Sequence, residues 1–302
     1  MVVKRLLKTA GMANLVLLLL VMVLWGTVYA VNGLPGAYAW FVLKFAVPIL
    51  GLAYILICTV LLLIRFRKKK SRSRGWTGLG VGTVLCLHLL LMVNIIPLAY
   101  PARIQNASPA VTVSWPFAAK TTVGWGGDAV NDNAPHAVWP SERWAYDLVM
   151  EPYGTGSKNP EDYGIWNQEL LSPVAGTVIA AYDAEPDISP GSEEILSMEG
   201  NHVYIQIEKT GTYLLLNHLK QSSLQVKTGD IVKPGDVLGR VGNSGSTSEP
   251  HLHIHHQRQN PLTVLHPVLA EGLPLYFEGT DADPIPIKGT VVTPDFKLKD
   301  QN

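Results

Sequence analysis

Hydrophobic and polar residues divide this chain into two parts of different character. The first hundred residues contain three long apolar stretches, at residues 13–31, 40–64 and 79–98. Each is close to or above the roughly 20 residues that an α-helix needs to cross a bilayer. We therefore predict an α-helical membrane anchor of three spans over residues 1–100.

Beyond residue 100 the pattern changes to short alternating or β-branched runs, separated by Gly, Pro, Asn and Asp. Helical periodicity is confined to about three turns at Asn131–Pro140. We predict an all-β domain over residues 111–295, preceded by a stalk at residues 101–110 and followed by a tail at residues 296–302. The predicted strands include Val111–Val113, Thr177–Ala181, His202–Ile207, Tyr213–Leu216 and His251–His255.

Basic residues flank the apolar stretches and predict their orientation. Lys4, Arg5 and Lys8 precede the first stretch, and residues 65–74 between the second and third contain seven Lys and Arg. Short basic loops stay in the cytoplasm, whereas the uncharged connection at residues 32–38 fits the outside. The prediction is a multi-pass protein of the cell membrane, in contact with the lipid bilayer. Its N-terminus is cytoplasmic and its C-terminal domain is extracytoplasmic.

Three features within the apolar stretches need an interpretation of their own. The first stretch has an alternative role as a signal peptide, because Val28-Tyr29-Ala30 resembles a cleavage site. Its apolar run is long for that role, and cleavage there would leave the later orientation unchanged. In the second stretch we expect Lys44 to lie near the outer end and to extend into polar surroundings. In the third we expect His88 to be a packed core residue.

Acidic residues are confined to the second part of the chain. No Asp or Glu precedes Asp128, so the first 127 residues carry 13 Lys and Arg and no acid. The remaining residues carry 24 Asp and Glu against 11 Lys and Arg. A net acidic second part argues against nucleic acid as a partner, because phosphate binding requires a basic surface.

Five residues of the second part have side chains suited to a hydrolytic metal site: His136, Asp147, His218, His251 and His253. His251 and His253 are the clearest local signal, because alternate residues of a strand share a face. Catalytic zinc sites use three protein ligands and leave a fourth position for water. Two imidazoles and one carboxylate, as in His136, Asp147 and His253, are a suitable set. The other two histidines would take up a proton or stabilise a developing oxyanion.

A series of longer motifs surrounds these residues. They are Gly126-Gly127, Ser172-Pro173-Val174-Ala175-Gly176-Thr177-Val178, Gly200-Asn201-His202-Val203, Asn217-His218-Leu219, Val226-Lys227-Thr228-Gly229-Asp230-Ile231-Val232, Leu238-Gly239-Arg240-Val241-Gly242-Asn243-Ser244-Gly245 and Pro250-His251-Leu252-His253. Together they resemble the lysostaphin-like (LytM-type) zinc metallopeptidase family, over about residues 111–295. The resemblance implies a β-rich fold, a Zn²⁺ cofactor and a substrate in the peptide part of bacterial peptidoglycan.

The same resemblance assigns roles to the five residues. It implies metal ligands at His136, Asp147 and His253, and catalytic histidines at His218 and His251. One departure concerns the first two ligands, which many members hold as His-x-x-x-Asp and which here are eleven positions apart. The sequence Glu142-Arg143-Trp144-Ala145-Tyr146-Asp147 is similar to a branch with an inserted loop before the Asp.

The remaining histidines are expected to be structural or exposed. His202 follows a turn and opens a predicted strand, which favours a structural role. His255 continues the face of His253, and an exposed position at a sheet edge is favoured over one near the metal. His256 and His266 are expected in surface or loop positions.

The predicted function is that of a membrane-anchored zinc metalloendopeptidase acting on peptidoglycan peptide, and two alternatives remain open. One is a non-catalytic scaffold or activator of the same fold, although all five site positions are filled. The other is a biotinyl or lipoyl carrier domain, because Ser172–Val178 and Asp230–Gly242 resemble its two halves. Lys209 lacks the Met or Asp that flanks a carrier lysine, which disfavours the second alternative.

The sequence points to no particular protein partner. We expect substrate specificity to lie in the loops Glu151–Gly164 and Tyr182–Ser197.

Overall fold

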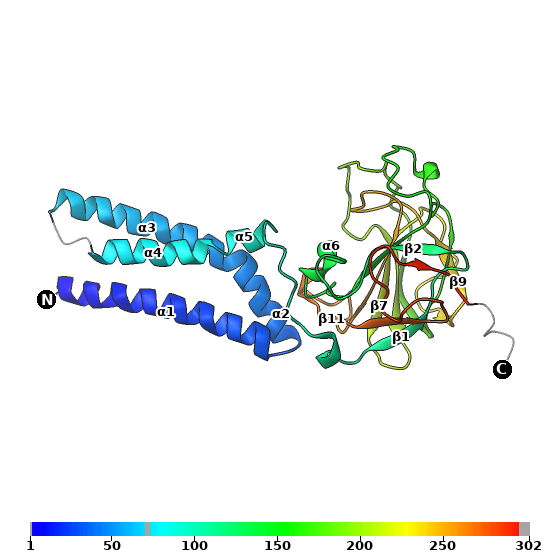
Figure 1. Cartoon of the computed structure of the whole chain (residues 1–302), viewed down its shortest axis with the longest axis horizontal. Helices are drawn as coiled ribbons and strands as arrows, with labels where there is room; N and C mark the ends of the chain where they lie inside the picture. Colours follow the sequence, from blue (N-terminus) through cyan, green and yellow to red (C-terminus); the bar gives the residue numbers. More distant parts are fainter. Residues whose placement is uncertain (1, 70–72, 296–302) are drawn as a thin grey trace. The chain divides into compact units, whose positions relative to one another are not determined.

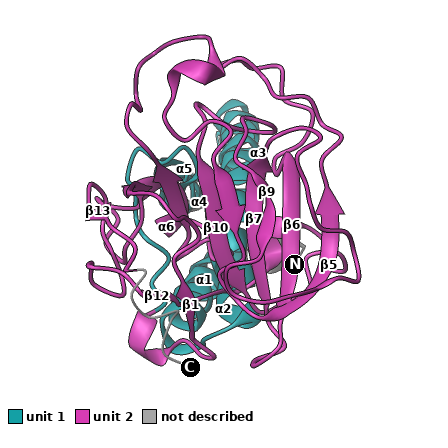
Figure 2. Ribbon diagram, turned by 90° about the vertical axis from the view of Figure 1, so that its right-hand side faces the viewer, with its two compact units in different colours: residues 1–102 teal, residues 103–302 magenta. Residues whose placement is uncertain are grey.

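The computed structural model describes residues 2–69 and 73–295, which form two compact units (Figures 1 and 2). Unit 1 comprises residues 1–102 and unit 2 comprises residues 103–302. Within the basic loop predicted between the second and third spans, residues 70–72 lie outside the described residues, as does the predicted tail at 296–302.

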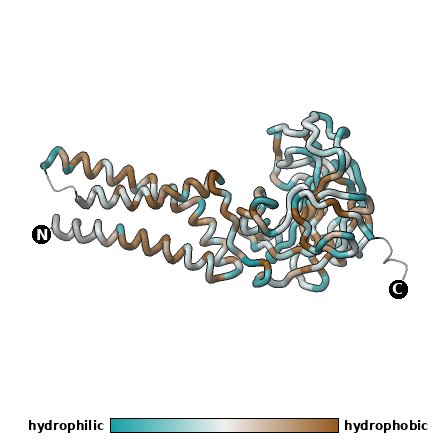
Figure 3. The backbone as a smooth tube through the Cα atoms, in the orientation of Figure 1, coloured by the Kyte–Doolittle hydropathy of each residue, from teal (hydrophilic) through white to brown (hydrophobic). Residues whose placement is uncertain are grey.

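Unit 1 is helical, and three of its segments are long and apolar enough to cross a membrane: Gly11–Ala30, Leu34–Arg67 and Gly75–Met92. Figure 3 shows the hydrophobic colouring along these helices. The second segment begins earlier than predicted, so most of the connection expected at residues 32–38 is helical. The helices are α1 (Val2–Ala30), α2 (Leu34–Phe41), α3 (Val47–Arg67), α4 (Ser73–Cys86) and α5 (Leu89–Met92).

A π-helical turn, Val42–Ala46, joins α2 to α3. It ends two residues before Pro48, whose ring would clash with the carbonyl of Lys44 in a regular α-helix. The turn also places Lys44 inside the unit, where it is 2% exposed and its Nζ donates to Asn94 Oδ1 at 2.9 Å. The expectation that Lys44 extends into polar surroundings is therefore wrong, because Asn94 provides a polar partner within the helical unit.

His88 is a packed core residue, as predicted. Its Nδ1 donates to the Leu85 carbonyl at 3.1 Å and its Nε2 accepts from Trp25 Nε1 at 3.1 Å. Both ring nitrogens of this buried side chain are therefore satisfied.

Unit 2 is β-rich and is built around a nine-stranded sheet in the order β13-β2-β3-β10-β7-β6-β5-β8, with β11 paired to β10. Its strands are β2 (Thr121–Trp125), β3 (Tyr146–Val149), β5 (Gly176–Tyr182), β6 (Asn201–Ile207), β7 (Tyr213–Leu219), β8 (Ile231–Val232), β10 (Leu252–Gln257), β11 (Gly272–Leu273) and β13 (Val291–Val292). All of these pairings are antiparallel. The five predicted strands agree with observed ones, except that β10 begins one residue after His251.

Four shorter strands form two separate pairs. β1 (Val111–Ser114) pairs in parallel with β12 (Leu275–Glu278), and β4 (Glu169–Leu171) pairs antiparallel with β9 (Val237–Arg240). The longest α-helix that the described part of unit 2 contains is α6 (Ala134–Ala137), a single turn within the stretch of predicted helical periodicity.

One face of the large sheet forms the hydrophobic core, and the other carries polar residues. On β10, Leu252 and Ile254 pack in the core. Because alternate residues point to opposite faces, His253, His255 and Gln257 share the other face. β10 lies beside β7 (Figure 2), with β3 on its other side near the middle of the sheet. The histidine side of β10 is therefore near the centre of one face of the sheet.

Candidate metal centre

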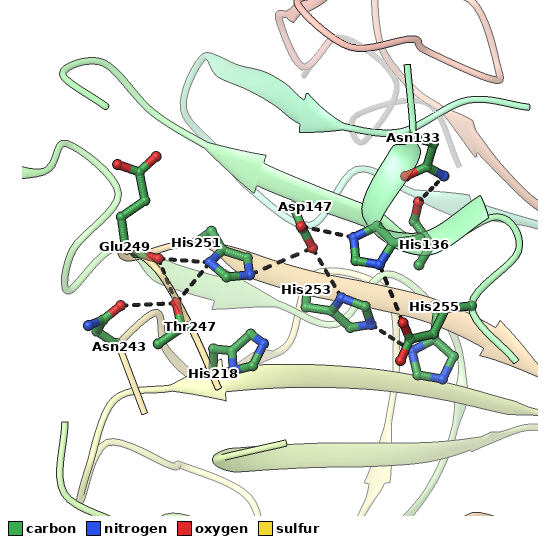
Figure 4. Close-up of polar contacts among 12 residues, drawn as sticks. Asn133, His136, Asp147, His218, Asn243, Thr247, Glu249, His251, His253 and His255 are labelled. Atoms are coloured by element: carbon green, nitrogen blue, oxygen red, sulfur yellow. Dashed lines mark hydrogen bonds and ion pairs between the residues drawn. The ribbon is translucent and has the colours of Figure 1, made fainter. Parts of the chain in front are cut away.

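The three predicted metal ligands come together from three elements. Asp147 lies on β3 and His253 on β10, directly opposite each other in the antiparallel ladder. His136 lies on α6. Its Nε2 is 2.9 Å from Asp147 Oδ2, and His253 Nδ1 is 3.0 Å from Asp147 Oδ1 (Figure 4). One nitrogen or oxygen from each residue lies within 4.8 Å of the others, and all three residues are buried.

Asn133 holds α6 in position. It is fully buried, and its Nδ2 donates to the Gly127 carbonyl at 3.2 Å and to the Ala145 carbonyl at 3.0 Å. The second bond joins the start of α6 to the chain two residues before Asp147. This link keeps His136 beside Asp147 despite the ten residues that separate them in the sequence.

The charges of these residues stabilise one another. Burial would raise the pKa of the Asp147 carboxyl, but His136 and His251 hold that pKa well below its ordinary value. Burial would lower the pKa of His136, but the Asp147 and Glu142 carboxylates more than offset it and raise this pKa to about 10. A divalent cation bound between the three residues would replace the proton on His136 Nε2.

The two predicted catalytic histidines lie beside this group. Their rings, His218 and His251, have centroids 4.7 Å apart, and His251 Nε2 is 3.6 Å from Asp147 Oδ1. His251 Nδ1 is 2.8 Å from the Glu249 carbonyl, and His218 Nδ1 is 2.9 Å from the Ser244 carbonyl. Because a carbonyl only accepts, each Nδ1 carries a proton, and in the neutral form of each ring the lone pair is on Nε2. Both rings can therefore act as bases through Nε2.

His218 has an unusual backbone conformation, with φ 63° in the left-handed region. Its amide donates to the Glu199 carbonyl at 3.2 Å, and its carbonyl accepts from the Gly242 amide at 3.0 Å. Together with the bond to Ser244, these contacts hold the residue in place. Burial, followed by the neighbouring His251 and His253, lowers the pKa of His218 to about 3, so the ring is neutral.

Two residues of the site were not predicted to belong to it. Glu142 Oε2 is 3.4 Å from His136 Nδ1, on the side of the ring opposite Asp147. His255 is 5% exposed, and its Nδ1 is 2.9 Å from His253 Nε2. The expectation that His255 is exposed at a sheet edge is therefore wrong, because β10 has neighbours on both sides. The alternation from His251 through His255 was the signal that pointed to it.

The remaining histidines lie outside the metal centre. The expected surface or loop position of His256 is wrong: it is 1% exposed on the core side of β10, with Nε2 2.7 Å from Thr212 Oγ1. His202 is half-buried and stacks on Tyr204 with ring centroids 4.2 Å apart, which agrees with a structural role. His266 is exposed, as predicted.

Comparison with known proteins finds a family match within unit 2. Residues 164–263 match the model of peptidase family M23, and they lie within the part of the chain for which a lysostaphin-like resemblance was predicted. M23 is a family of zinc-dependent metallopeptidases. The matched range contains His218, His251 and His253 and begins after His136 and Asp147.

Individual relatives match over limited lengths. An uncharacterized metalloprotease of Haemophilus influenzae is 30% identical over 122 residues, covering 36% of this chain and 26% of that protein. The peptidoglycan DD-endopeptidase ShyC of Vibrio cholerae is 32% identical over 100 residues, covering 32% of this chain and 22% of that protein. The matches thus span about a quarter of these relatives. Among solved structures, the antimicrobial peptidase lysostaphin from Staphylococcus simulans matches with 18% identity and a TM-score of 0.31, over 50% of this chain and 46% of that chain.

Proposed function

We propose that this protein is a membrane-anchored zinc metallopeptidase that hydrolyses peptide bonds of bacterial peptidoglycan. The observation that carries the proposal is the convergence of His136, Asp147 and His253, with His218 and His251 beside them, in an M23-type domain. All five predicted positions are filled by side chains that this chemistry requires.

The donor atoms fit a zinc ion. Two imidazole nitrogens and one carboxylate oxygen are ligands that Zn²⁺ prefers, and three protein ligands leave a position open. Each imidazole also has a second partner at its other nitrogen, which orients a ligating ring. When bound, Zn²⁺ would supply Lewis acidity toward water and toward the scissile carbonyl.

His218 and His251 would handle the protons of the reaction. Each has Nδ1–H fixed on a main-chain carbonyl, so each presents the lone pair of Nε2. Either Nε2 can accept a proton from the attacking water and pass it to the departing amine. Once protonated, the same atom donates a hydrogen bond to the oxyanion that develops on the scissile carbonyl.

The composition of the site favours an amide over a sugar bond. Most glycosidases use two carboxylates on either side of the scissile bond. Here only Asp147 lies among the imidazoles, and the second carboxylate, Glu142, contacts the outer nitrogen of His136 rather than the opposite side of a substrate position. The basic residues flanking the apolar segments support an extracytoplasmic location, where peptidoglycan peptide is the available substrate. The relative ShyC, a peptidoglycan DD-endopeptidase, supports the same substrate class.

Digestion of purified cell-wall sacculi by the full chain in detergent tests the proposal. We expect new amino groups without new reducing sugar ends, and we expect a zinc chelator to stop their release. New reducing ends that persist with chelator would remove the peptidase assignment. Zinc binding without either kind of release would favour the non-catalytic scaffold, and a covalently modified Lys209 detected by mass spectrometry would favour the carrier.

A further inference from the structure

A chain of polar side chains runs along β10 away from the metal centre. His253 Nε2 is 2.9 Å from His255 Nδ1, and His255 Nε2 is 3.2 Å from Gln257 Oε1. Gln257 Nε2 donates to the Gln259 carbonyl at 2.7 Å. His253, His255 and Gln257 are all buried, so these bonds are shielded from water.

The direction of every hydrogen bond in this chain follows from its far end. The Gln259 carbonyl can only accept, so the Gln257 amide group donates to it and the Gln257 Oε1 faces His255. Oε1 can only accept, so the proton of the His255 ring is on Nε2. No carboxylate is within hydrogen-bond distance of His255 among the described residues, and a neutral ring with its proton on Nε2 has a lone pair on Nδ1. His253 Nε2 must therefore carry a proton and donate it to His255 Nδ1.

We propose that His255, oriented by Gln257, is a positioning residue that holds His253 in the tautomer presenting Nδ1 to the metal. The inference rests on the proposed metal site and extends it to two residues that do not touch the ion. A neutral imidazole has one lone pair, and a proton on Nε2 leaves that lone pair on Nδ1. Nδ1 is 3.0 Å from Asp147 Oδ1, and a cation bound between these two atoms would replace the proton that their hydrogen bond holds without it. Without an acceptor at Nε2, the proton can move to Nδ1 and block the ligating atom.

Zinc affinity tests this role directly. We would measure it by competition with a chromogenic chelator, using the purified full chain in detergent. His255→Leu removes the acceptor and is expected to weaken zinc binding by about 10- to 100-fold. His255→Asn places an amide oxygen close to the former Nδ1 position and is expected to remain within a few-fold of the unchanged protein. Gln257→Leu leaves His255 in place but removes its orientation, and an intermediate loss is expected.

His256→Leu is the matched control. His256 is the next residue of the same strand, is equally buried, and bonds to Thr212 and Pro274 on the opposite face. Its loss should lower the unfolding temperature and leave zinc affinity unchanged. In the Co²⁺-loaded protein, the visible absorption of the ion should change in His255→Leu and not in His256→Leu.

Two results would overturn the inference while zinc binding by the unchanged protein stands. One is an unchanged zinc affinity in both His255→Leu and Gln257→Leu. The other is an equal loss in His255→Leu, His255→Asn and His256→Leu, which would show general destabilisation. If the unchanged protein does not bind zinc, the proposed function itself fails, which is a separate result of the same measurement.

Discussion

Each of the four histidines around Asp147 has one ring nitrogen held by a protein partner. For the two proposed ligands the partner is a side chain, Glu142 or His255. For the two proposed catalysts it is a main-chain carbonyl. A side-chain partner that is itself oriented or charged raises the basicity of a ligand. A main-chain carbonyl fixes the tautomer of a base and leaves its other nitrogen available to exchange protons.

This division leads to a prediction for single substitutions. His253→Ala or Asp147→Ala removes one of three proposed ligands, so bound zinc should be lost. His218→Ala or His251→Ala should retain most of the zinc and lower hydrolysis by about 10²-fold or more. Metal analysis of the purified variants, together with the sacculus assay, checks both halves. An empty site in His251→Ala with a filled one in His253→Ala would reverse the roles assigned to the pair.

His256 leads to a prediction about acid stability. Burial lowers the pKa of His256 from its ordinary value of 6.5 to about 4, so the folded protein holds the ring neutral. Its contribution to stability is complete above pH 6.5 and is lost as the pH falls from 6.5 towards 4, because only the unfolded chain takes up the proton there. The contribution lost is about 3 kcal/mol at most.

The substitution His256→Leu removes this titration. Denaturant unfolding at pH 7 and pH 4 should therefore show a smaller acid-induced loss of stability in the variant than in the unchanged protein. Equal losses in the two proteins would contradict the prediction. The other buried histidines titrate in both proteins, so their contribution to the acid-induced loss of stability cancels in the comparison.

At the scale of elements, the segment between His136 and Asp147 does more than connect these two residues, because it also provides a side chain that contacts the proposed metal centre. Its Glu142 contacts His136 Nδ1, and His136 and its neighbours lower the pKa of this carboxyl to about 2 although burial opposes the shift. Glu142→Ala should weaken zinc binding by about tenfold or more, because the ligating ring loses its outer partner. Glu169→Ala, which removes an exposed ion pair with Arg240, is the control and should not change zinc affinity. Equal affinities in the two variants would show that Glu142 has no role at the metal.

Local pattern predicted two of the strands that carry the site, β7 and β10, whereas β3, which carries Asp147, was not among the predicted strands. Alternation along His251–His255 indicated a strand with histidines on one face, and this is what β10 shows. The pattern could not reveal that β10 lies between β3 and β7, because strand order depends on long-range pairing. The burial of His255 and His256 depends on that strand order. Local pattern does not contain it, and for this reason both residues were expected in exposed positions. The family resemblance assigned roles to the five site residues. Glu142 belongs to the stretch Glu142–Asp147 that the resemblance includes, but no role was assigned to it, and only its distance to His136 places it in the site.

The π-helical turn before Pro48 illustrates a similar limit. Hydropathy predicted the apolar segment around Lys44. It could not predict that the turn would direct this side chain towards Asn94, 50 residues later in the sequence.

At the scale of the whole molecule, the prediction concerns which side of the membrane holds the metal centre. If the three apolar segments span the membrane, their basic flanks at residues 4–8 and 65–74 predict that unit 2 lies outside the cytoplasm. A reporter that is active only outside the cytoplasm, fused after Asn302, should be active in cells. A fusion at residues 32–33, between the first two apolar helices, should behave in the same way, and one at residue 70 should be silent. Activity of a cytoplasm-only reporter after Asn302 would contradict this topology.

The parallel pairing of β1 with β12 has a mechanical consequence. The chain from unit 1 enters unit 2 through β1, which lies in register with β12 from Val111 beside Leu275 to Ser114 beside Glu278. Tension along this entry, as between a fixed anchor and a domain attached to a stiff polymer, would load the bonds of the pair in shear. In shear, all the backbone hydrogen bonds between β1 and β12 carry the force at once and must break together. A pull perpendicular to the strands would break the same bonds one after another. Trp115 follows the last residue of β1, and Phe277 belongs to β12. Their rings have centroids 4.7 Å apart, and this contact strengthens the pairing of the two strands. In single-molecule pulling from the N-terminal side, unit 2 should therefore yield in one abrupt step at high force, and Phe277→Ala should lower that force.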